Sequence, residues 1–511
     1  MLLNLVGPER KLHRADETIE KRLTFLTSDQ ISYSPIGIGM EKNDTGSYNP
    51  AIGYPHINKL GVKWVRIQSG WFRTEKEAGV YDFAWIDDIV DNILSQGCTP
   101  WMCLCYGNSV YDDTAVPGSR ATDHPPIYTQ DARLAWQRYV KACLAHFKGR
   151  VHYYEIWNEP DGTHCWGQGV NGAEYADLVR ITAPLIRQAD SDNKVIAGCM
   201  CNLVRMQTFC DEDYVGVNFD SDPGIGPFFR NWYQKDVAQM IDYVTFHSYA
   251  PRPEQKMNEL YAALRKTLDM YNPNIGIIQG ETGVHSDFSR HGALNSGEWN
   301  CASQYKFLLR RLTTDVANGA FFASYFSMLD MYENLQQSDS DIRRDLYGFY
   351  GVLGAEFDEE GRATGVYNPK PSYTALQCLA TVMAEGVERE ADQIQFCVFR
   401  NVYWGSTDLD ENSPMGDKLT TYTLRRKAGD RMYIYYLASP LIGFTYDGST
   451  SLMLPEPMEH PAVLDLANGT IYAIDNDHIT MHDGKQVLLR VMLRDYPLAI
   501  IDLDNTSLVI N

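Results

Sequence analysis

Eight short apolar segments alternate with longer segments of helical period between Ile36 and about Gly386. Each has the length of a β-strand, and its nearly unbroken apolar character is typical of a strand covered on both faces. Eight consecutive strand–helix units predict an α/β fold, a (β/α)₈ TIM barrel with enlarged loops. A doubly wound open sheet is the alternative, but it rarely needs eight consecutive units, and the chain lacks its glycine fingerprint. The predicted strands span residues 36–41, 63–68, 99–106, 151–159, 194–200, 242–249, 275–281 and 320–327.

The segments between these strands carry apolar residues at helical spacing. In residues 81–97, Phe83, Ile86, Val90 and Ile93 fall on one stripe, which predicts an amphipathic helix with one face on the barrel. The same interpretation applies to residues 131–147, 173–189, 253–271, 303–319 and 370–386.

The pattern changes beyond about Val387. Short β-type runs are separated there by Gly, Asp, Asn and Pro, which predicts a β-sandwich of roughly 120 residues. We therefore expect a barrel over residues 31–386 and a C-terminal β-sandwich domain over 387–511. Residues 1–30 precede the first barrel strand and are expected to pack on the sandwich, adding a strand to it. The β-type runs are residues 393–400, 431–439, 462–467, 470–474, 486–493 and 498–503.

Composition limits the classes of partner. The 511 residues carry a formal net charge of −21, which argues against nucleic-acid or anionic-membrane binding, since both need a basic face. No stretch approaches the ~20 apolar residues of a membrane span, and the chain start resembles no signal peptide. We expect no nucleic-acid or membrane partner; the oligomeric state stays open, a homo-oligomer included.

Eleven cysteines are scattered along the chain without a Cys-x-x-Cys motif. Pairs such as Cys103 and Cys105 alternate within apolar runs, as buried strand residues do. His478 and His482 have a spacing that suits a metal only on a helix, and their surroundings are β-type. We therefore expect no metal and no cofactor, and free thiols in a reducing cytoplasm.

Two predicted strands end in a glutamate. Glu159 ends the fourth strand in "VHYYEIWNEPDG", and Glu281 ends the seventh in "IGIIQGETG". In a (β/α)₈ barrel the chemistry takes place at the carboxyl ends of the strands. Two carboxylates across the barrel mouth are what glycosidic bond cleavage requires, one to give a proton and one to attack the anomeric carbon. Either glutamate alone is more often a helix cap or a solvated loop acid, so their joint placement carries the prediction.

The tip "IWNEP", followed by Asp161 and by a strand-seven glutamate about 120 residues later, resembles clan A of the glycoside hydrolases, the retaining (β/α)₈ group. The chain also resembles family 39 of that clan, which joins such a barrel to a β-sandwich. The segments "LGVKWVRIQSGW", "GVYDFAWIDDIVDNILSQG" and "YVTFHSYA" are similar in style. The resemblance covers residues 36–386. For the C-terminal domain it is limited to the kind of domain, a β-sandwich.

This resemblance implies roles for the strand-end residues. Glu159 would be the acid/base and Glu281 the nucleophile, and Asn158 would bind the sugar 2-hydroxyl. Arg66, at the end of strand two, would neutralise and orient Glu281, unless it belongs to an ordinary barrel ion pair.

Two residues of strand six complete the implied site. Tyr249 would donate a hydrogen bond to the nucleophile. His247 would line the pocket floor, or would be a hydrogen-bonded core histidine.

The implied activity is retaining hydrolysis of terminal sugars from short oligosaccharides or glycosides, with β-xylosidase-like action as the first hypothesis. Two features differ from the β-xylosidases of the family. Gly280-Glu281-Thr282-Gly283 replaces Thr-Glu-Phe/Trp-Asn, and strand eight ends in "FFASYFSML" without a tryptophan. Arabinofuranosidase, galactosidase or glucosidase action are the alternatives, and a non-catalytic carbohydrate-binding barrel is the alternative of another class.

Residues of the rim loops are candidates for sugar contacts, because aromatic rings stack on sugar faces and amides bind hydroxyls. A few are expected to bind sugar, whereas most single aromatic residues only pack, and Asn108 could equally bind loop backbone. The loop over residues 284–299 is long and polar enough for a lid or a subsite wall, with a solvated insertion without a role as the alternative. The rim candidates are Trp71, Tyr106, Asn108, Trp166, Trp299 and Tyr325.

Overall fold

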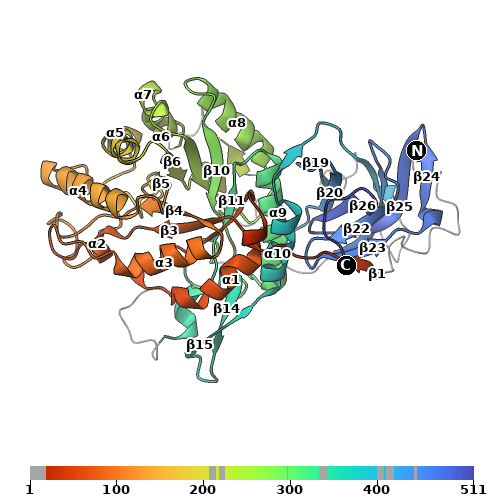
Figure 1. Cartoon of the computed structure of the whole chain (residues 1–511), viewed down its shortest axis with the longest axis horizontal. Helices are drawn as coiled ribbons and strands as arrows, with labels where there is room; N and C mark the ends of the chain where they lie inside the picture. Colours follow the sequence, from red (N-terminus) through yellow and green to blue (C-terminus); the bar gives the residue numbers. More distant parts are fainter. Residues whose placement is uncertain are drawn as a thin grey trace.

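The structure, a computed structural model, consists of a barrel and a β-sandwich side by side (Figure 1). None of the helices in the described part of the chain is long and apolar enough to cross a membrane. Residues 1–18 of the predicted N-terminal segment, and Arg400 in the run 393–400, lie outside the described residues. The described residues are 19–206, 215–217, 225–295, 297–332, 342–399, 408–409, 419–441 and 446–511.

The predicted (β/α)₈ barrel with a β-sandwich domain is confirmed. All eight apolar segments contain a strand, and these strands form a closed, parallel barrel in the order β10-β11-β2-β3-β4-β5-β6-β9. The barrel strands are β2 (Ile36–Gly39), β3 (Trp64–Gln68), β4 (Thr99–Leu104), β5 (Tyr153–Ile156), β6 (Lys194–Met200), β9 (Tyr243–His247), β10 (Gly276–Glu281) and β11 (Ala323–Tyr325).

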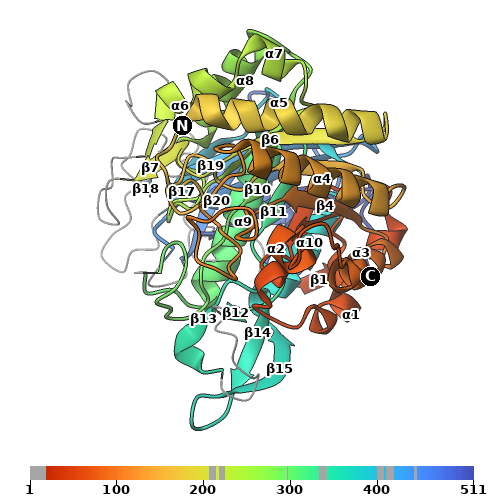
Figure 2. The ribbon, with the colours of Figure 1, turned by 90° about the vertical axis from the view of Figure 1, so that its left-hand side faces the viewer.

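Helices surround the barrel, and Figure 2 shows α4 and α5 lying side by side across it. In α3 the buried residues include Ile86, Val90 and Ile93 of the predicted stripe. The helices are α1 (Tyr54–Ile57), α2 (Trp71–Thr74), α3 (Ala84–Ser95), α4 (Gln130–His146), α5 (Gly172–Ala189), α6 (Ile225–Trp232), α7 (Lys235–Ala238), α8 (Met257–Asp269), α9 (Cys301–Ala317) and α10 (Pro371–Val382).

The barrel interior changes from apolar to charged along its axis. A cluster that contains Trp64, Trp101 and Phe322 is almost completely buried, with the rings of Trp64 and Phe322 stacked 4.4 Å apart. Two residues after Trp64 on the same strand, Arg66 enters the interior, and its guanidinium lies 5.7 Å from the Trp101 ring centre. Aromatic packing therefore closes one side of the polar layer and keeps water away from it.

The two glutamate-bearing strands do not end as regular strands. The predicted strand 151–159 is β5, Tyr153–Ile156, because Trp157 and Glu159 have φ of 66° and 46°, which an extended strand excludes. In β10 the register with β9 shifts between Gln279 and Glu281. Such a bulge re-aims the side chain that follows it, so strand alternation alone does not set the direction of either glutamate.

The C-terminal domain contains two antiparallel sheets. One has the order β1-β23-β22-β26-β20-β19-β16, and the other β18-β17-β21-β25-β24. In the first sheet, β1 (Ile19–Arg22) of the N-terminal segment pairs with β23. The remaining strands are β16 (Val387–Arg389), β17 (Gln395–Phe399), β18 (Asp408–Leu409), β19 (Leu419–Arg426), β20 (Arg431–Leu437), β21 (Asp447–Met453), β22 (Pro461–Asp465), β23 (Thr470–Ala473), β24 (Ile479–His482), β25 (Lys485–Arg494) and β26 (Leu498–Asp502).

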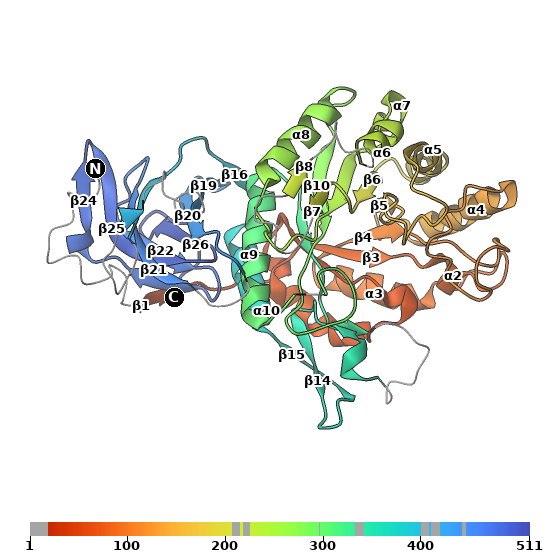
Figure 3. The ribbon, with the colours of Figure 1, turned by 180° about the vertical axis from the view of Figure 1, so that it is seen from behind.

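The sandwich packs on the barrel through α9 (Figure 3). Lys306 of α9 pairs with Asp495 of the sandwich at 2.6 Å, with both side chains almost completely buried, and Thr314 lies 3.0 Å from the hydroxyl of Tyr422. A hairpin of β14 (Leu353–Phe357) and β15 (Ala363–Pro369) projects from the bottom of the barrel in Figures 1 and 3, away from both domains. The short ladders β7 (Val204–Met206) with β8 (Val215–Val217), and β12 (Met331–Tyr332) with β13 (Tyr347–Gly348), lie in the loops.

Candidate active site

A cavity of about 460 Å³ opens at the carboxyl ends of the barrel strands, with Glu159 and Glu281 in its wall. Its walls combine acidic, imidazole and aromatic side chains, as carbohydrate sites do. The lining residues are Lys42, Glu159, His164, Cys201, Tyr249, Glu281, His291, Gly292, Ala293, Phe326, Met331, Gly348 and Tyr350.

Glu281 is held at both carboxylate oxygens. Arg66 donates from Nη1 to Oε2 over 2.7 Å, and the hydroxyl of Tyr249 donates to Oε1 over 2.6 Å. The Glu281 side chain is 14% exposed, whereas Arg66 is completely buried. The carboxylate of Glu281 therefore faces the cavity, while the buried guanidinium of Arg66 compensates its negative charge.

Glu159 is held by two imidazoles. Nδ1 of His247 lies 2.7 Å from Oε1, and Nε2 of His164 makes a short contact with Oε2. Burial works against ionisation of Glu159, but the hydrogen bonds with His164 and His247 outweigh it and hold the pKa of this carboxyl well below its usual range. A carboxylate oxygen of Glu159 and one of Glu281 lie within 4.8 Å of each other, with His247 between them.

The tip that carries Glu159 is fixed by its own side chains. Nε1 of Trp157 donates to the backbone oxygen of Cys165 over 3.0 Å and closes the loop. The carboxylate of Asp161 accepts from the backbone amides of Cys201 and Asn202, at 2.8 and 2.9 Å. Because these residues follow β6, the loop after β5 is tied to the next strand of the barrel.

Arg66 connects the residues below the cavity. Its Nε pairs with Glu155 at 2.8 Å, its Nη2 donates to Asn158 over 2.9 Å, and its Nη1 lies 3.5 Å from Glu41 as well as 2.7 Å from Glu281. One guanidinium thus orients the carboxylate of Glu281 and the amide next to Glu159 at the same time.

Two further groups around Glu281 have raised pKa values. Burial raises the pKa of Glu41 to about 8, although Arg66 acts in the opposite direction. Burial and the neighbouring Glu281 raise the pKa of Tyr249 well above its usual range, so its hydroxyl remains a donor.

Three sets of histidine, cysteine and carboxylate atoms in the described part of the chain are close enough to hold a metal ion. Each is already a set of complementary partners, such as Glu155 with Arg66, His247 with Glu159, and His247 with Cys199 at 3.2 Å. Hydrogen bonding therefore explains the clustering without an ion. The sets are Glu155, Cys199 and His247; Glu159, His164 and Cys165; and Glu159, His247 and Glu281.

Comparison with known proteins decides the family. The model of Glycosyl hydrolases family 39 matches residues 47–408, which is more than half of the chain. This chain belongs to glycosyl hydrolases family 39. It is therefore a glycoside hydrolase of clan A, and the resemblance predicted from "IWNEP" and Glu281 is confirmed.

Solved structures of the family share the fold at low sequence identity. A family 39 glycoside hydrolase from the gut symbiont Bacteroides cellulosilyticus WH2 is 14% identical over 94% of this chain and 83% of that chain, with a TM-score of 0.63. The family 39 enzyme from Xanthomonas axonopodis pv. citri is 15% identical over 98% and 100%, with a TM-score of 0.54. A family 39 β-xylosidase from Caulobacter crescentus is 14% identical over 94% and 98%, with a TM-score of 0.51. No curated protein sequence matches this family 39 chain.

Six of the site residues predicted from the sequence lie together in this family 39 barrel. Each is joined to another by a hydrogen bond, although their strands are far apart in the chain. They are Arg66, Asn158, Glu159, His247, Tyr249 and Glu281.

The six rim candidates are not among the residues that line this cavity. Their polar atoms contact the protein instead. Asn108 donates to the backbone of Glu75, and the indole of Trp71 donates to the carboxylate of the same residue, so both organise a loop. The other partners are Gln68 for Tyr106, Glu174 for Trp166, the backbone oxygen of Leu294 for Trp299 and that of Val284 for Tyr325.

Several lining residues had no predicted role. Cys201 and Phe326 directly follow barrel strands and Lys42 comes three residues after one, so their position at the carboxyl ends was a usable signal. His164 lies five residues after Glu159 in the same loop. Tyr350 comes more than twenty residues after β11, the last strand of the barrel, and the local sequence pattern does not predict its position in the cavity.

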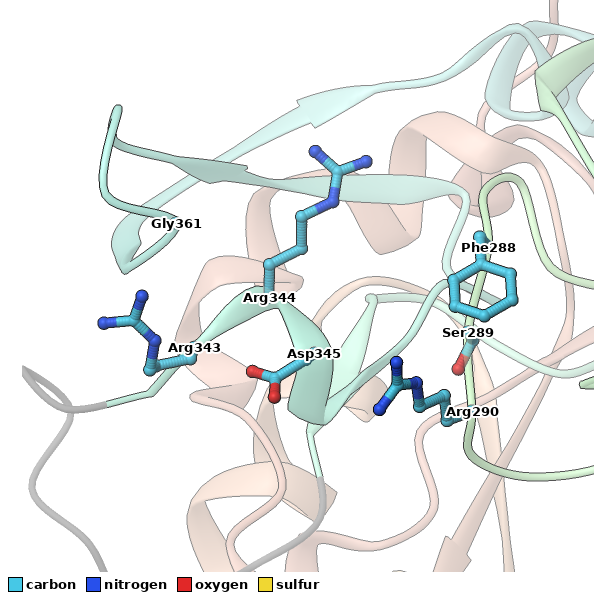
Figure 4. Close-up of a pocket in the computed structure, with 7 residues that line it drawn as sticks. All are labelled: Phe288, Ser289, Arg290, Arg343, Arg344, Asp345 and Gly361. Carbon is cyan, nitrogen blue, oxygen red and sulfur yellow. The ribbon is translucent and has the colours of Figure 1, made fainter.

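A second hollow of about 410 Å³ lies on the outer side of the loop over residues 284–299 (Figure 4). Arg344 pairs with Asp287 there, and Arg343 donates to the backbone of Glu360. Its lining carries one carboxylate, that of Asp345, and so no opposed pair for glycoside cleavage. Ser289 lines this hollow while His291 lines the cavity at the glutamates, so the loop lies between the two.

Replacing Arg66 by methionine is expected to lower the free energy of unfolding by about 3–5 kcal/mol, because Glu155 would be left as a fully buried charge without its partner. Arg150→Met is the matched control. Arg150 pairs with Asp87 and Asp91 while 28% exposed, and such a pair contributes at most about 1 kcal/mol. Urea unfolding of the two variants gives the comparison. Equal losses would show that Arg66 is not the residue that compensates the buried carboxylates.

Proposed function

We propose that this family 39 chain is a retaining exo-glycosidase in which Glu281 is the nucleophile and Glu159 the acid/base. The observation that carries the proposal is the separation of the two carboxylates, whose oxygens approach within 4.8 Å. Retaining enzymes place their carboxyl groups about 5–5.5 Å apart, whereas inverting enzymes need ~6.5–9.5 Å to admit a water molecule.

The reaction would proceed in two displacements. Glu281 attacks the anomeric carbon while Glu159 protonates the leaving oxygen, so that a glycosyl–enzyme bond forms as the glycosidic bond breaks. Water then attacks the same carbon, Glu159 takes its proton, and the carboxylate of Glu281 is released. Arg66 and Tyr249 favour the ionised nucleophile, since both donate to its oxygens.

Asn158 would bind the sugar hydroxyl next to the anomeric carbon. Its Oδ1 accepts from Arg66, and the contact that Nδ2 makes within the described residues is a long one of 3.7 Å with the sulfur of Cys165. The amide is therefore oriented by one end and retains donor capacity at the other. A hydrogen bond that strengthens as charge develops at the sugar ring lowers the barrier.

The size of the cavity favours short substrates. At about 460 Å³ it lies in the lower half of the roughly 300–1,000 Å³ range of small-molecule pockets, which suits a terminal sugar better than a long polymer. β-Xylosidase-like action remains the first hypothesis, with arabinofuranosidase, galactosidase and glucosidase action as alternatives. Nine cysteines in the described part of the chain are free, which supports action in a reducing compartment such as the cytoplasm.

A panel of nitrophenyl glycosides that includes furanosides tests this proposal. We expect turnover of at least one member, with the first-formed sugar keeping the anomeric configuration of the substrate in a proton NMR time course. Inverted product would contradict the roles of the two glutamates. Saturable binding of a sugar without turnover of any glycoside would instead favour a non-catalytic carbohydrate-binding barrel.

A further inference from the structure

His164 is the exposed one of the two histidines that contact Glu159. Its side chain is 60% exposed and lines the cavity, while that of Glu159 is 12% exposed. It stands in the loop closed by Trp157 and Cys165, so its imidazole contacts Oε2 from the solvent side. His164 therefore lies on the solvent side of Oε2, where a proton would enter or leave this oxygen.

His247 is placed differently. Its side chain is completely buried, and its ring nitrogens contact Glu159 at 2.7 Å and the sulfur of Cys199 at 3.2 Å. Burial raises the pKa of the Cys199 thiol well above its usual range, so this partner stays protonated. His247 is thus enclosed by protein partners at both nitrogens, and His164 alone of the two reaches water.

The acid/base role conflicts with these contacts. The first displacement needs a proton on Glu159, yet both of its oxygens face imidazole nitrogens that stabilise the carboxylate form. Two cavity carboxylates within 4.8 Å also disfavour a second negative charge, so one proton near the pair is stabilised. The geometry places that proton between Glu159 and His164.

We propose that His164 is a positioning residue that holds the acid proton for Glu159 and takes it back after each turnover. This inference rests on the proposed function and concerns the same cavity. In the free protein the pair is a His164 imidazolium and a Glu159 carboxylate. The pair binds one proton as a unit, whichever partner carries it.

The proton balance of the cycle follows from this arrangement. As the glycosidic bond breaks, the proton shared with His164 moves onto Glu159 and from there to the leaving oxygen, so His164 becomes neutral and Glu159 is left as a carboxylate. In the second displacement Glu159 removes a proton from the attacking water, and that proton returns to His164. Each turnover consumes one water molecule and leaves the pair as it began.

Contacts with Cys165 and Glu159 raise the pKa of His164 to about 11. Burial raises the pKa of Cys165 and keeps it a neutral thiol, so Glu159 supplies the negative charge. A proton on the pair is therefore retained at neutral pH and lost only as the pH rises toward the raised pKa of His164. The other charged or titratable groups around this loop and cavity are Asp161, Cys201, Lys42, His247, Tyr249, Glu281, His291 and Tyr350.

A titration without substrate tests the pair directly. Imidazole NMR signals of the unmodified protein and of Glu159→Gln are followed against pH, with His164→Asn to assign the signal. We expect His164 to titrate at least one pH unit higher in the unmodified protein than in Glu159→Gln, where it should approach ~6.5, its ordinary value. The same midpoint in both proteins would overturn the proposal.

The second measurement is kcat/KM against pH for a glycoside with a poor leaving group. In His164→Asn the proton must reside on Glu159 alone, so the basic limb should move to lower pH by at least about one unit. His146→Asn is the matched control, since His146 contacts Asp87 at 2.8 Å outside the cavity, and its profile should not move. Thermal unfolding confirms that both variants fold.

The outcomes separate this inference from the function on which it rests. A uniform loss of kcat/KM in His164→Asn, with both limbs in place, would reduce His164 to a structural residue and overturn the proposal. A raised His164 midpoint in a protein that hydrolyses no glycoside would instead contradict the proposed function, while the proton-holding pair would stand.

Discussion

Replacing Glu281 by alanine is expected to lower kcat/KM by on the order of 10⁴-fold or more on every glycoside, because no other group can form the glycosyl–enzyme bond. Within the described residues, the carboxylate with an oxygen within 4.8 Å of Glu159 in the cavity is that of Glu281. Initial rates on the best member of the nitrophenyl panel provide the measurement.

Glu298→Ala is the control for this substitution. Glu298 belongs to the same loop after β10 but is exposed and does not line the cavity, so its removal should leave the rate within a factor of about two. If Glu281→Ala kept more than a few per cent of the activity, Glu281 would not be the nucleophile, and the proposed retaining mechanism would be wrong.

Replacing Glu159 by alanine is expected to have an effect that depends on the leaving group. Alkyl glycosides need a proton at the leaving oxygen and should lose about 10²–10⁴-fold, whereas an activated phenol needs none and should form the glycosyl–enzyme nearly normally. Added azide should then release the sugar as a glycosyl azide of retained configuration, because this small anion attacks without a base. Rates across a series of phenols, with and without azide, give the test.

The contrast with Glu281→Ala distinguishes the two roles. Azide should not restore turnover with retained configuration to Glu281→Ala, since its cavity lacks the group to which the sugar must first be attached. If both variants depended equally on the acidity of the leaving group, the division into nucleophile and acid/base would be wrong.

The fold and the opposed positions of the two glutamates were predictable because their signals are local. An apolar run covered on both faces must become a buried strand, and eight such runs with helices between them leave few arrangements besides a closed barrel. In that barrel every strand end lies at one rim, so Glu159 and Glu281 had to be near one another. The contacts of Arg66 and Tyr249 with Glu281 were implied by the family resemblance.

Which aromatic side chains line the cavity was not predictable in this way. Trp71 begins α2 and Trp166 belongs to a rim loop, and both are almost completely buried, because a large ring is more readily accommodated by packing than by exposure. Phe326 and Tyr350 line the cavity instead.

The sequence by itself determined the strand order, the two domains and the identity of the two opposed glutamates, because periodicity and strand-end position are properties of short segments. The tertiary structure alone decided which side chains meet. The loop after β5 turns through positive φ at Trp157 and Glu159 and places Glu159 between His164 and His247, 5 and 88 positions away in the chain. The protonation of a carboxylate depends on the partners that folding brings within a few ångströms of it, so the state of Glu159 is set by the assembled barrel.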